Sequence, residues 1–251
     1  VKCATKLRHI PSPASGQLDY LTRSAHVPRT GGAPGVCARR TATPAASLAR
    51  VGAPRYGRGM AIEILPATGD RFDDAETALD SGDGPECQCQ WWMLPNGPWK
   101  ETSVAERTGL FRAELEGDLP PGLIAYVDGE PAGWVRVGPR TAQPRLARTR
   151  NVTGSTIEPL DDHDVWAVTC FVVRKAYRGG GLMRDLLDAA VDAARDGGAR
   201  VVEGYPRDPT VAKMPVNDLY LGTVSIFEEA GFTVVGRPKP DRALVSLTLR
   251  D

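Results

Sequence analysis

The clearest pattern of hydrophobic and polar positions lies in the second half of the chain. Residues 165–173, VWAVTCFVV, are apolar at almost every position, which predicts a central strand covered on both faces. Residues 182–198 place apolar side chains on one stripe at helical spacing and end in two glycines, which predicts an amphipathic helix. A strand, a short turn and a helix therefore follow one another here.

Weaker patterns predict the remaining elements. We expect strands at 61–65, 199–205, 232–236 and 243–250, helices at 71–79 and 101–117, and a single helix over 218–231. Residues 122–138 form two β-rich runs around Asp128-Gly129, a dipeptide that favours a tight turn with positive φ, so they predict a hairpin. Together these elements indicate a mixed α/β domain.

The first 59 residues differ in composition from the rest. They are rich in Ala, Arg, Pro, Gly, Ser and Thr without periodic order, and they carry ten Lys or Arg against one acid, Asp19. Residues 60–251 carry 21 basic and 30 acidic residues, so the two segments have net charges of +9 and −9. We expect residues 1–59 to be a disordered basic tail or a wrongly assigned upstream segment, and residues 60–251 to be the folded domain.

Composition also excludes several classes of function. The negative balance of residues 60–251 argues against a nucleic-acid partner. No window has the roughly eighteen apolar residues of a membrane span, and the first thirty residues lack a secretory signal, so we expect a cytoplasmic protein with no membrane partner. The five cysteines predict free thiols. Cys87 and Cys89 lack a second ligand pair, so we expect no metal site.

Residues 178–183, RGGGLM, carry most of the chemical information because they join the predicted strand to the predicted helix. Glycines let the chain turn sharply and present N–H groups, and the helix adds its positive end, so such a turn can hold a pyrophosphate. A dinucleotide-binding fingerprint fails because Arg184 stands where a third glycine is needed, and a Walker loop lacks its Gly-Lys-Ser/Thr. A purely structural turn is the alternative interpretation.

At these residues the sequence resembles the GNAT superfamily of acyl-CoA-dependent N-acetyltransferases. The family signature is Arg or Gln, two residues, Gly, one residue, then Gly or Ala; Arg178 and Gly181 match it, and Met183 stands at the last position. The order of predicted elements over residues 60–251 and the Glu-Ala-Gly-Phe at 229–232 extend the resemblance. It implies a mixed, mostly antiparallel sheet flanked by helices, with a splayed fourth strand, and acetyl-CoA as co-substrate without a metal.

The resemblance also implies where acetyl-CoA binds and what it does. The pantetheine arm would lie along the backbone of Phe171, Val172 and Val173. The pyrophosphate would bind the loop that consists of Arg178, Gly179, Gly180, Gly181, Leu182 and Met183. The protein would then be an N-acetyltransferase that passes an acetyl group directly to a primary amine of a small molecule or a protein, and both a monomer and a homodimer are compatible with that function.

The general acid and base follow less directly from the residues. The tyrosine with which many relatives protonate the leaving thiolate is Phe227 here, so Tyr220 or Tyr205 would have to serve as the acid. The predicted strand before the loop contains no acid, so Glu203 or Asp164 would have to serve as the base. Ordinary burial or solvation is the competing explanation for each. We predict Tyr220 and Glu203 as catalytic residues; without them the domain would be a silent acyl-CoA-binding sensor or interaction module.

Three tryptophans and the net charge bear on the acceptor. Trp91, Trp92 and Trp99 either line an acceptor pocket or belong to the core. The charge of −9 on residues 60–251 favours a cationic acceptor such as a polyamine, an aminoglycoside or a protein lysine.

Overall fold

A seven-stranded sheet forms the centre of the fold in the computed structural model, which describes residues 60–250; the expectations for residues 1–59 lie outside the described residues. The strands are β1 (Ile62–Pro66), β2 (Gly122–Val127), β3 (Glu130–Pro139), β4 (Val165–Val173), β5 (Val201–Gly204), β6 (Thr233–Lys239) and β7 (Arg242–Thr248). Their order is β1-β2-β3-β4-β5-β7-β6. Only β4 and β5 pair in parallel, which confirms the predicted mixed, mostly antiparallel sheet.

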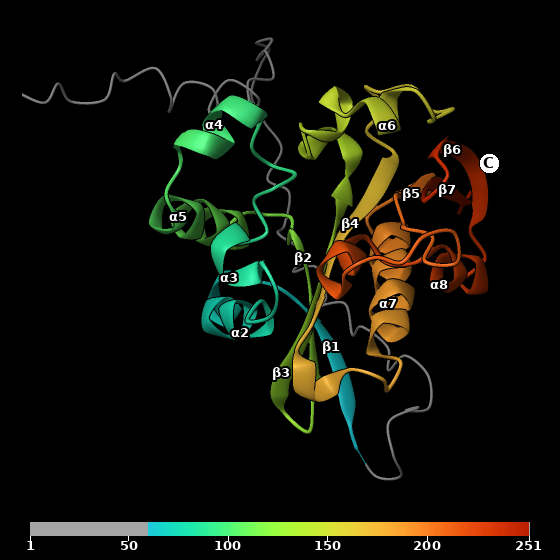
Figure 1. Cartoon of the computed structure of the whole chain (residues 1–251). Coiled ribbons are helices and arrows are strands. Elements are labelled where there is room, and N and C mark those ends of the chain that lie inside the picture. The colour runs from blue at the N-terminus through green and yellow to red at the C-terminus, as the bar shows by residue number, and fades with distance from the viewer. Residues whose placement is uncertain (1–59, 251) are drawn as a thin grey trace, which may run out of the picture. The chain divides into compact units, whose positions relative to one another are not determined.

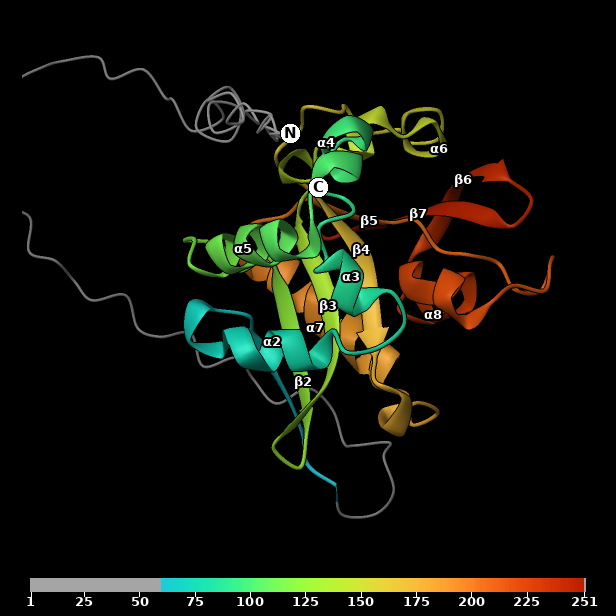
Figure 2. The same cartoon turned by 60° about the vertical axis from the view of Figure 1, so that its left-hand side comes forward.

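Helices cover both faces of this sheet (Figures 1 and 2). The α-helices are α2 (Phe72–Ala78), α3 (Gly84–Cys87), α4 (Asn96–Glu101), α5 (Val104–Leu115), α6 (Arg150–Thr153), α7 (Leu182–Asp196) and α8 (Val224–Glu229). Residues 60–250 also contain five short 3-10 segments: η2 (Gly69–Arg71), η3 (Arg140–Ala142), η4 (Leu146–Arg148), η5 (Lys175–Tyr177) and η6 (Val216–Leu221). Apolar side chains of α2 and α5 pack on one face, and those of α7 and α8 pack on the other.

Strand β4 separates from β5 half-way along its length. The parallel pairing runs only from Val165↔Val201 to Val168↔Gly204, so the remainder of β4 has β3 alone as its partner. A register shift between β3 and β4 leaves Thr169 as an extra residue at this point, because Arg136 pairs with Cys170 and Val137 pairs with Val168. The sheet therefore opens beside the second half of β4, as the resemblance implied.

The bulge in β4 is held in place by side chains from outside the sheet. The indole N–H of Trp92 donates to the carbonyl oxygen of Thr169 at 3.0 Å, and the Thr169 hydroxyl donates to Oε1 of Gln143 at 2.6 Å. Trp92 is only 6% exposed and packs against Tyr205. These bonds satisfy the polar groups that the irregular pairing frees.

The predicted single helix over 218–231 is wrong, because the chain breaks at Gly222. Gly222 has φ of +77°, a conformation that few residues other than glycine adopt, and it separates η6 from α8. A bridge between Arg207 and Thr223 then fixes the break, since the Arg207 N–H donates to the Gly222 carbonyl and the Val224 N–H donates to the Arg207 carbonyl. Tyr220 and Phe227 consequently do not share one helical face.

Candidate active site

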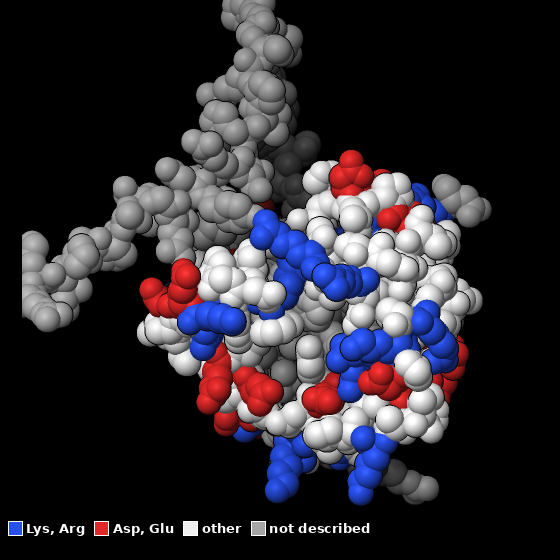
Figure 3. Space-filling model, turned by 45° about the horizontal axis from the view of Figure 1, so that its top comes forward, with Lys and Arg blue, Asp and Glu red and all other residues white. Residues whose placement is uncertain are grey.

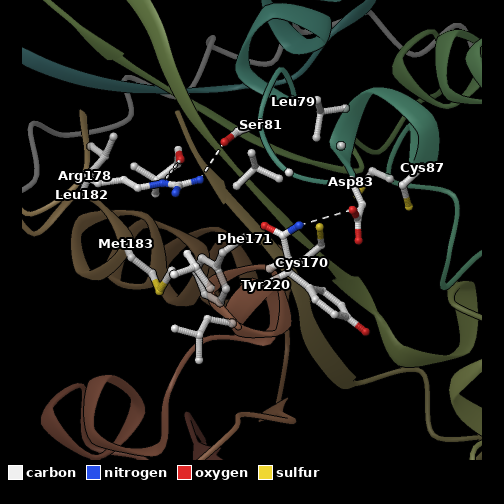
Figure 4. A pocket seen from close by; sticks show the side chains of 18 of the residues that line it. Leu79, Ser81, Asp83, Cys87, Cys170, Phe171, Arg178, Leu182, Met183 and Tyr220 are labelled. Carbon is white, nitrogen blue, oxygen red and sulfur yellow. Dashed lines mark hydrogen bonds between the residues drawn. The ribbon is translucent and has the colours of Figure 1, made fainter. Parts of the chain in front are cut away.

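A cavity of about 780 Å³ lies where β4 and β5 separate. Its walls come from the second half of β4, the turn before α7, the segment between α2 and α3, and η6. Figure 4 shows Leu79, Ser81 and Cys87 on one side of the cavity and Leu182, Met183 and Tyr220 on the other. Figure 3 shows a hollow in the molecular surface with Lys and Arg side chains along its border. The cavity is the space that the open sheet leaves between its two helical layers.

The glycine-rich turn forms one end of the cavity. Gly179 and Gly181 have φ of +84° and +93°, and no atom lies within 4 Å of the place where either would carry a Cβ. Gly181 is the N-cap of α7, whose 15 residues direct the positive end of the helix toward this turn. The first N–H groups of α7 have no acceptor inside the helix. An anion can therefore approach the backbone here closely.

The structure brings most of the predicted cofactor residues to this cavity. Its lining includes Phe171, Val172, Val173, Arg178, Gly179, Gly181, Leu182 and Met183, but not Gly180. Met183 is partly buried against the core beneath α7. The Arg178 side chain donates to the Val173 carbonyl at 2.9 Å and to the Ser81 hydroxyl at 2.7 Å, so it links the turn to the segment after α2 (Figure 4).

Sequence comparison decides the family. The profile described as "Acetyltransferase (GNAT) family" matches residues 87–212, which is half of the chain. The chain belongs to the GNAT family of acetyltransferases. Among curated proteins, none matches this GNAT chain.

Solved structures resemble the fold of this GNAT protein at low sequence identity. The GNAT domain of S. lividans PAT has 19% identity and a TM-score of 0.45, covering 75% of this chain and 90% of that one. An N-acetyltransferase from Staphylococcus aureus Mu50 has 14% identity and a TM-score of 0.46, covering 76% and 99%. The yncA protein of Salmonella typhimurium, solved with acetyl-CoA, has 16% identity and a TM-score of 0.45, covering 76% and 95%.

The sequence predicted neither a metal site nor a membrane-spanning helix, and residues 60–250 can be examined for both. Within residues 60–250, no cluster of three His, Cys, Asp or Glu side chains could hold a metal ion. None of the helices in that range combines the length and the apolar character that crossing a bilayer requires.

Glu203 lies outside the cavity and is fully buried. Its carboxylate accepts hydrogen bonds from Nη1 of Arg140 at 3.0 Å, from the Thr156 hydroxyl at 2.5 Å and from the Tyr205 hydroxyl at 2.9 Å. Burial and the neighbouring Glu203 raise the pKa of Tyr205 well above its ordinary value. This placement argues against Glu203 as the general base and against Tyr205 as the acid, and it explains both as members of a buried polar network.

Tyr220 lines the cavity from η6 and is partly buried. Burial, together with the neighbouring Cys170 on β4, raises the pKa of Tyr220 to about 12. The phenol is therefore protonated at neutral pH. Phe227, in contrast, is fully buried against Phe171 and Phe232 and does not line the cavity.

Two acidic residues that the sequence analysis did not single out do line the cavity. Asp83 and Glu86 are exposed at its border, in and just before α3, and an oxygen of Asp83 lies 3.5 Å from the amide nitrogen of Asn217 (Figure 4). Asp164 lies on the surface instead, within 3.4 Å of Arg250. No periodicity or motif distinguishes Asp83 and Glu86 from other acids in turns, so only the tertiary structure reveals their position.

The three tryptophans divide between the cavity and the core. Trp91 and Trp99 line the cavity and contact each other edge to face, with ring centroids 5.1 Å apart. Trp92 belongs to the core beside the bulge of β4. Both alternatives considered for these residues thus occur, at different positions.

Cys89 occupies an unusual environment beside the cavity. Its sulfur accepts hydrogen bonds from the indole N–H of Trp134 at 3.1 Å and from Nε of Arg136 at 3.2 Å. Gln88 and Cys89 have φ of +49° and +53°, the left-handed conformation that costs non-glycine residues energy. Burial opposes ionisation, but hydrogen bonds from Cys170 and Arg136 and the charge of Arg136 outweigh it and hold the pKa of Cys89 below its ordinary value.

We predict that Cys89 ionises at lower pH than an ordinary cysteine, for which the pKa is about 8.5. The absorbance of thiolates at 240 nm, followed against pH in the native protein and in Cys89→Ser, measures this as a difference curve. The difference should develop below pH 8. Cys87→Ser is the matched control, because burial raises the pKa of Cys87 to about 11 and its difference curve should develop only in alkali. A Cys89 curve that coincides with that of Cys87 would contradict the prediction.

Proposed function

We propose that this protein is an N-acetyltransferase that moves an acetyl group from acetyl-CoA directly to a primary amine, and that its domain spans residues 60–251. The observation that carries the proposal is the single cavity that combines the unpaired half of β4, the glycine turn at the start of α7 and the protonated phenol of Tyr220. An activated thioester needs little more than a positioned amine, a donor for the developing oxyanion and an acid for the leaving thiolate.

In this proposal each part of the cavity binds one part of acetyl-CoA. The N–H groups of Gly179, Gly181, Leu182 and Met183 bind the pyrophosphate, because they line the cavity at the positive end of α7. The backbone of Phe171, Val172 and Val173 binds the pantetheine arm, because the β5 side of this part of β4 is unpaired. Polar backbone groups at such an open edge are available to a ligand.

Proton transfer is assigned to three other residues that line the cavity, Tyr220, Asp83 and Glu86. Tyr220 protonates the thiolate of CoA as it leaves. Asp83 or Glu86 accepts the proton of the amine through water, since these are the carboxylates that line the cavity among the described residues. Both acids are exposed, which is the observation that favours the second candidate, a silent acyl-CoA-binding module. Turnover with an amine acceptor distinguishes the two candidates.

Gly181 offers a sharp test of the cofactor site. Gly181→Glu and Gly181→Gln introduce the same size and the same strain at φ of +93°, but only Glu adds a negative charge where the pyrophosphate would bind. We expect Gly181→Glu to bind acetyl-CoA at least about tenfold more weakly than Gly181→Gln, because juxtaposed like charges cost several kcal/mol. Isothermal titration calorimetry of the whole chain with acetyl-CoA measures both affinities.

Thermal unfolding of the native protein provides the reference for this comparison. A ligand at 100 times its Kd stabilises a protein by about 2.7 kcal/mol, which corresponds to roughly 5–10 °C for a domain of this size. Acetyl-CoA and CoA should produce that shift, and NAD should not. Equal affinity of the two Gly181 variants for acetyl-CoA would show that the pyrophosphate does not bind at this turn. An unchanged Tm with both acetyl-CoA and CoA would overturn the proposed function.

A further inference from the structure

Arg145 is a buried cation for which residues 60–250 supply no anionic partner. It is 5% exposed, and its Nε donates to the Leu94 carbonyl at 2.7 Å, but Nη1 and Nη2 have no hydrogen-bond partner among the described residues. Buried guanidinium groups in the rest of this fold have one: Arg136 pairs with Glu114 at 2.6 Å, and Arg140 pairs with Glu203 at 3.0 Å. Arg145 therefore retains several N–H donors for a group that the described residues do not supply.

Aromatic rings replace the missing carboxylate only in part. The guanidinium carbon of Arg145 lies 3.7 Å from the centroid of Trp91 and 5.7 Å from that of Trp99. Such stacking stabilises a cation over the ring face but leaves the N–H groups in the guanidinium plane unbonded. Because arginine stays protonated in proteins, the charge persists at neutral pH.

The guanidinium lies beside the part of the cavity that Trp91 and Trp99 line. Trp91 and Trp99, on which it stacks, both line the cavity. The ionisable groups that influence Arg145 are Cys87 and Tyr220, and both line the cavity as well. Burial raises the pKa of Cys87 to about 11 and that of Tyr220 to about 12, so both are neutral at pH 7 and neither balances the charge.

We propose that Arg145 binds a carboxylate of the acceptor, so that the substrate is an amino carboxylate such as an amino acid. This inference rests on the proposed acetyltransferase function and narrows its acceptor. A planar carboxylate can lie in the plane of the guanidinium and accept two parallel N–H bonds while Trp91 covers its face. A monoanion also matches the single positive charge of Arg145. The positive charge of Arg145 thus disfavours the cationic acceptor that the net charge of −9 on residues 60–251 favours.

Binding requires a side-chain movement at the cavity wall, because Nη1 and Nη2 are both covered in this structure. Trp91 and Trp99 lie against the guanidinium, so their fluorescence is a direct probe of that movement. The readout does not depend on turnover.

The test compares amino carboxylates with their amides. Glycine, L-leucine and L-phenylalanine, each beside its amide, are titrated into the protein saturated with CoA while tryptophan fluorescence and heat are recorded. We expect each carboxylate to bind about 10- to 100-fold more tightly than its amide, the range of a charge-assisted bidentate pair. Arg145→Gln should abolish that preference and leave the binding of the amides within twofold; Arg145→Lys should retain part of it.

Arg107→Gln is the matched control. Arg107 also stacks on Trp99, at 4.5 Å, but its Nε donates to the Glu86 carbonyl and its Nη1 to the Thr102 carbonyl, both at 2.8 Å. This variant should keep the preference for carboxylates. 2-Aminoethylphosphonate serves as the second anion, and tighter binding of it than of every amino carboxylate would assign the site to a phosphate-type group instead.

The outcomes separate this inference from the proposed function. If amides bind as tightly as carboxylates, or if Arg145→Gln weakens both equally, Arg145 has only a structural role and the inference is overturned. The proposed function is tested by a different measurement: it would be overturned if neither acetyl-CoA nor CoA raised the Tm of the native protein.

Discussion

Replacement of Tyr220 by phenylalanine is expected to lower kcat about 100-fold or more and to leave the KM for acetyl-CoA nearly unchanged, since a positioned general acid contributes about 10²- to 10⁴-fold. The phenol lines the cavity, and its pKa, raised to about 12 by burial and by Cys170, keeps the proton in place at neutral pH. Steady-state kinetics with an amine acceptor measures the effect. The alkaline limb of the kcat profile should also change in the variant.

Tyr126→Phe is the matched control for this prediction. Tyr126 is 7% exposed on β2, donates its hydroxyl proton to Asp74 at 2.8 Å and does not line the cavity, so its replacement should leave kcat unchanged. Phe227→Tyr should not restore activity to Tyr220→Phe, because the Phe227 ring packs tightly against Gly204 and Gly222 in the core. Full activity of Tyr220→Phe would exclude Tyr220 as the acid.

Glu203→Gln is expected to destabilise the fold by about 3–5 kcal/mol, the usual cost of removing one partner of a buried ion pair. Arg140 and Glu203 are only 2% and 0% exposed at their side chains, so the variant leaves a buried, uncompensated guanidinium. The Tm should fall by about 6–20 °C in thermal unfolding, at roughly 2–4 °C per kcal/mol for this size. The kcat of the folded fraction, measured well below Tm, should not change.

Two further variants separate stability from catalysis at this position. Glu228→Gln removes an exposed carboxylate of α8 and should leave the Tm within the error of the measurement. The double variant Arg140→Met, Glu203→Met should recover much of the lost stability, because apolar replacement of both partners of a buried pair is often neutral. A fall in kcat with an unchanged Tm for Glu203→Gln would contradict this prediction and would support Glu203 as a catalytic residue.

Local signals in the sequence predicted the central elements correctly. The apolar run at 165–173 is β4, and the helical stripe from Leu182 to Ala194 is buried along α7. Asp128 and Gly129 have φ of +51° and +85°, as the predicted tight turn requires. Each of these features depends on side-chain periodicity or on the conformation of one or two residues, so a short window of sequence contains the information.

The break at Gly222 shows where a local pattern failed. The periodicity over 218–231 continues through the glycine, and a glycine within a helix costs only about 1 kcal/mol. The hydrogen bonds between Arg207 and the backbone of Gly222 and Val224 decide the conformation, and they join residues about fifteen positions apart. This contact directs Tyr220 to the cavity and Phe227 to the core.

By itself, therefore, the sequence determined the mixed sheet, the glycine turn at the start of α7 and the family they indicate, because these depend on local patterns and on their order. Only the tertiary structure decided which polar side chains meet. Glu203 lies on a strand beside the expected site, yet hydrogen bonds from Arg140, Thr156 and Tyr205 hold its carboxylate away from the cavity. Arg145 lies in a basic loop of ordinary composition, and only packing shows that it is buried, stacked on Trp91 and without an anionic partner in the described part of the chain. Burial and pairing arise from contacts between distant segments, and the energy of a charge depends on both.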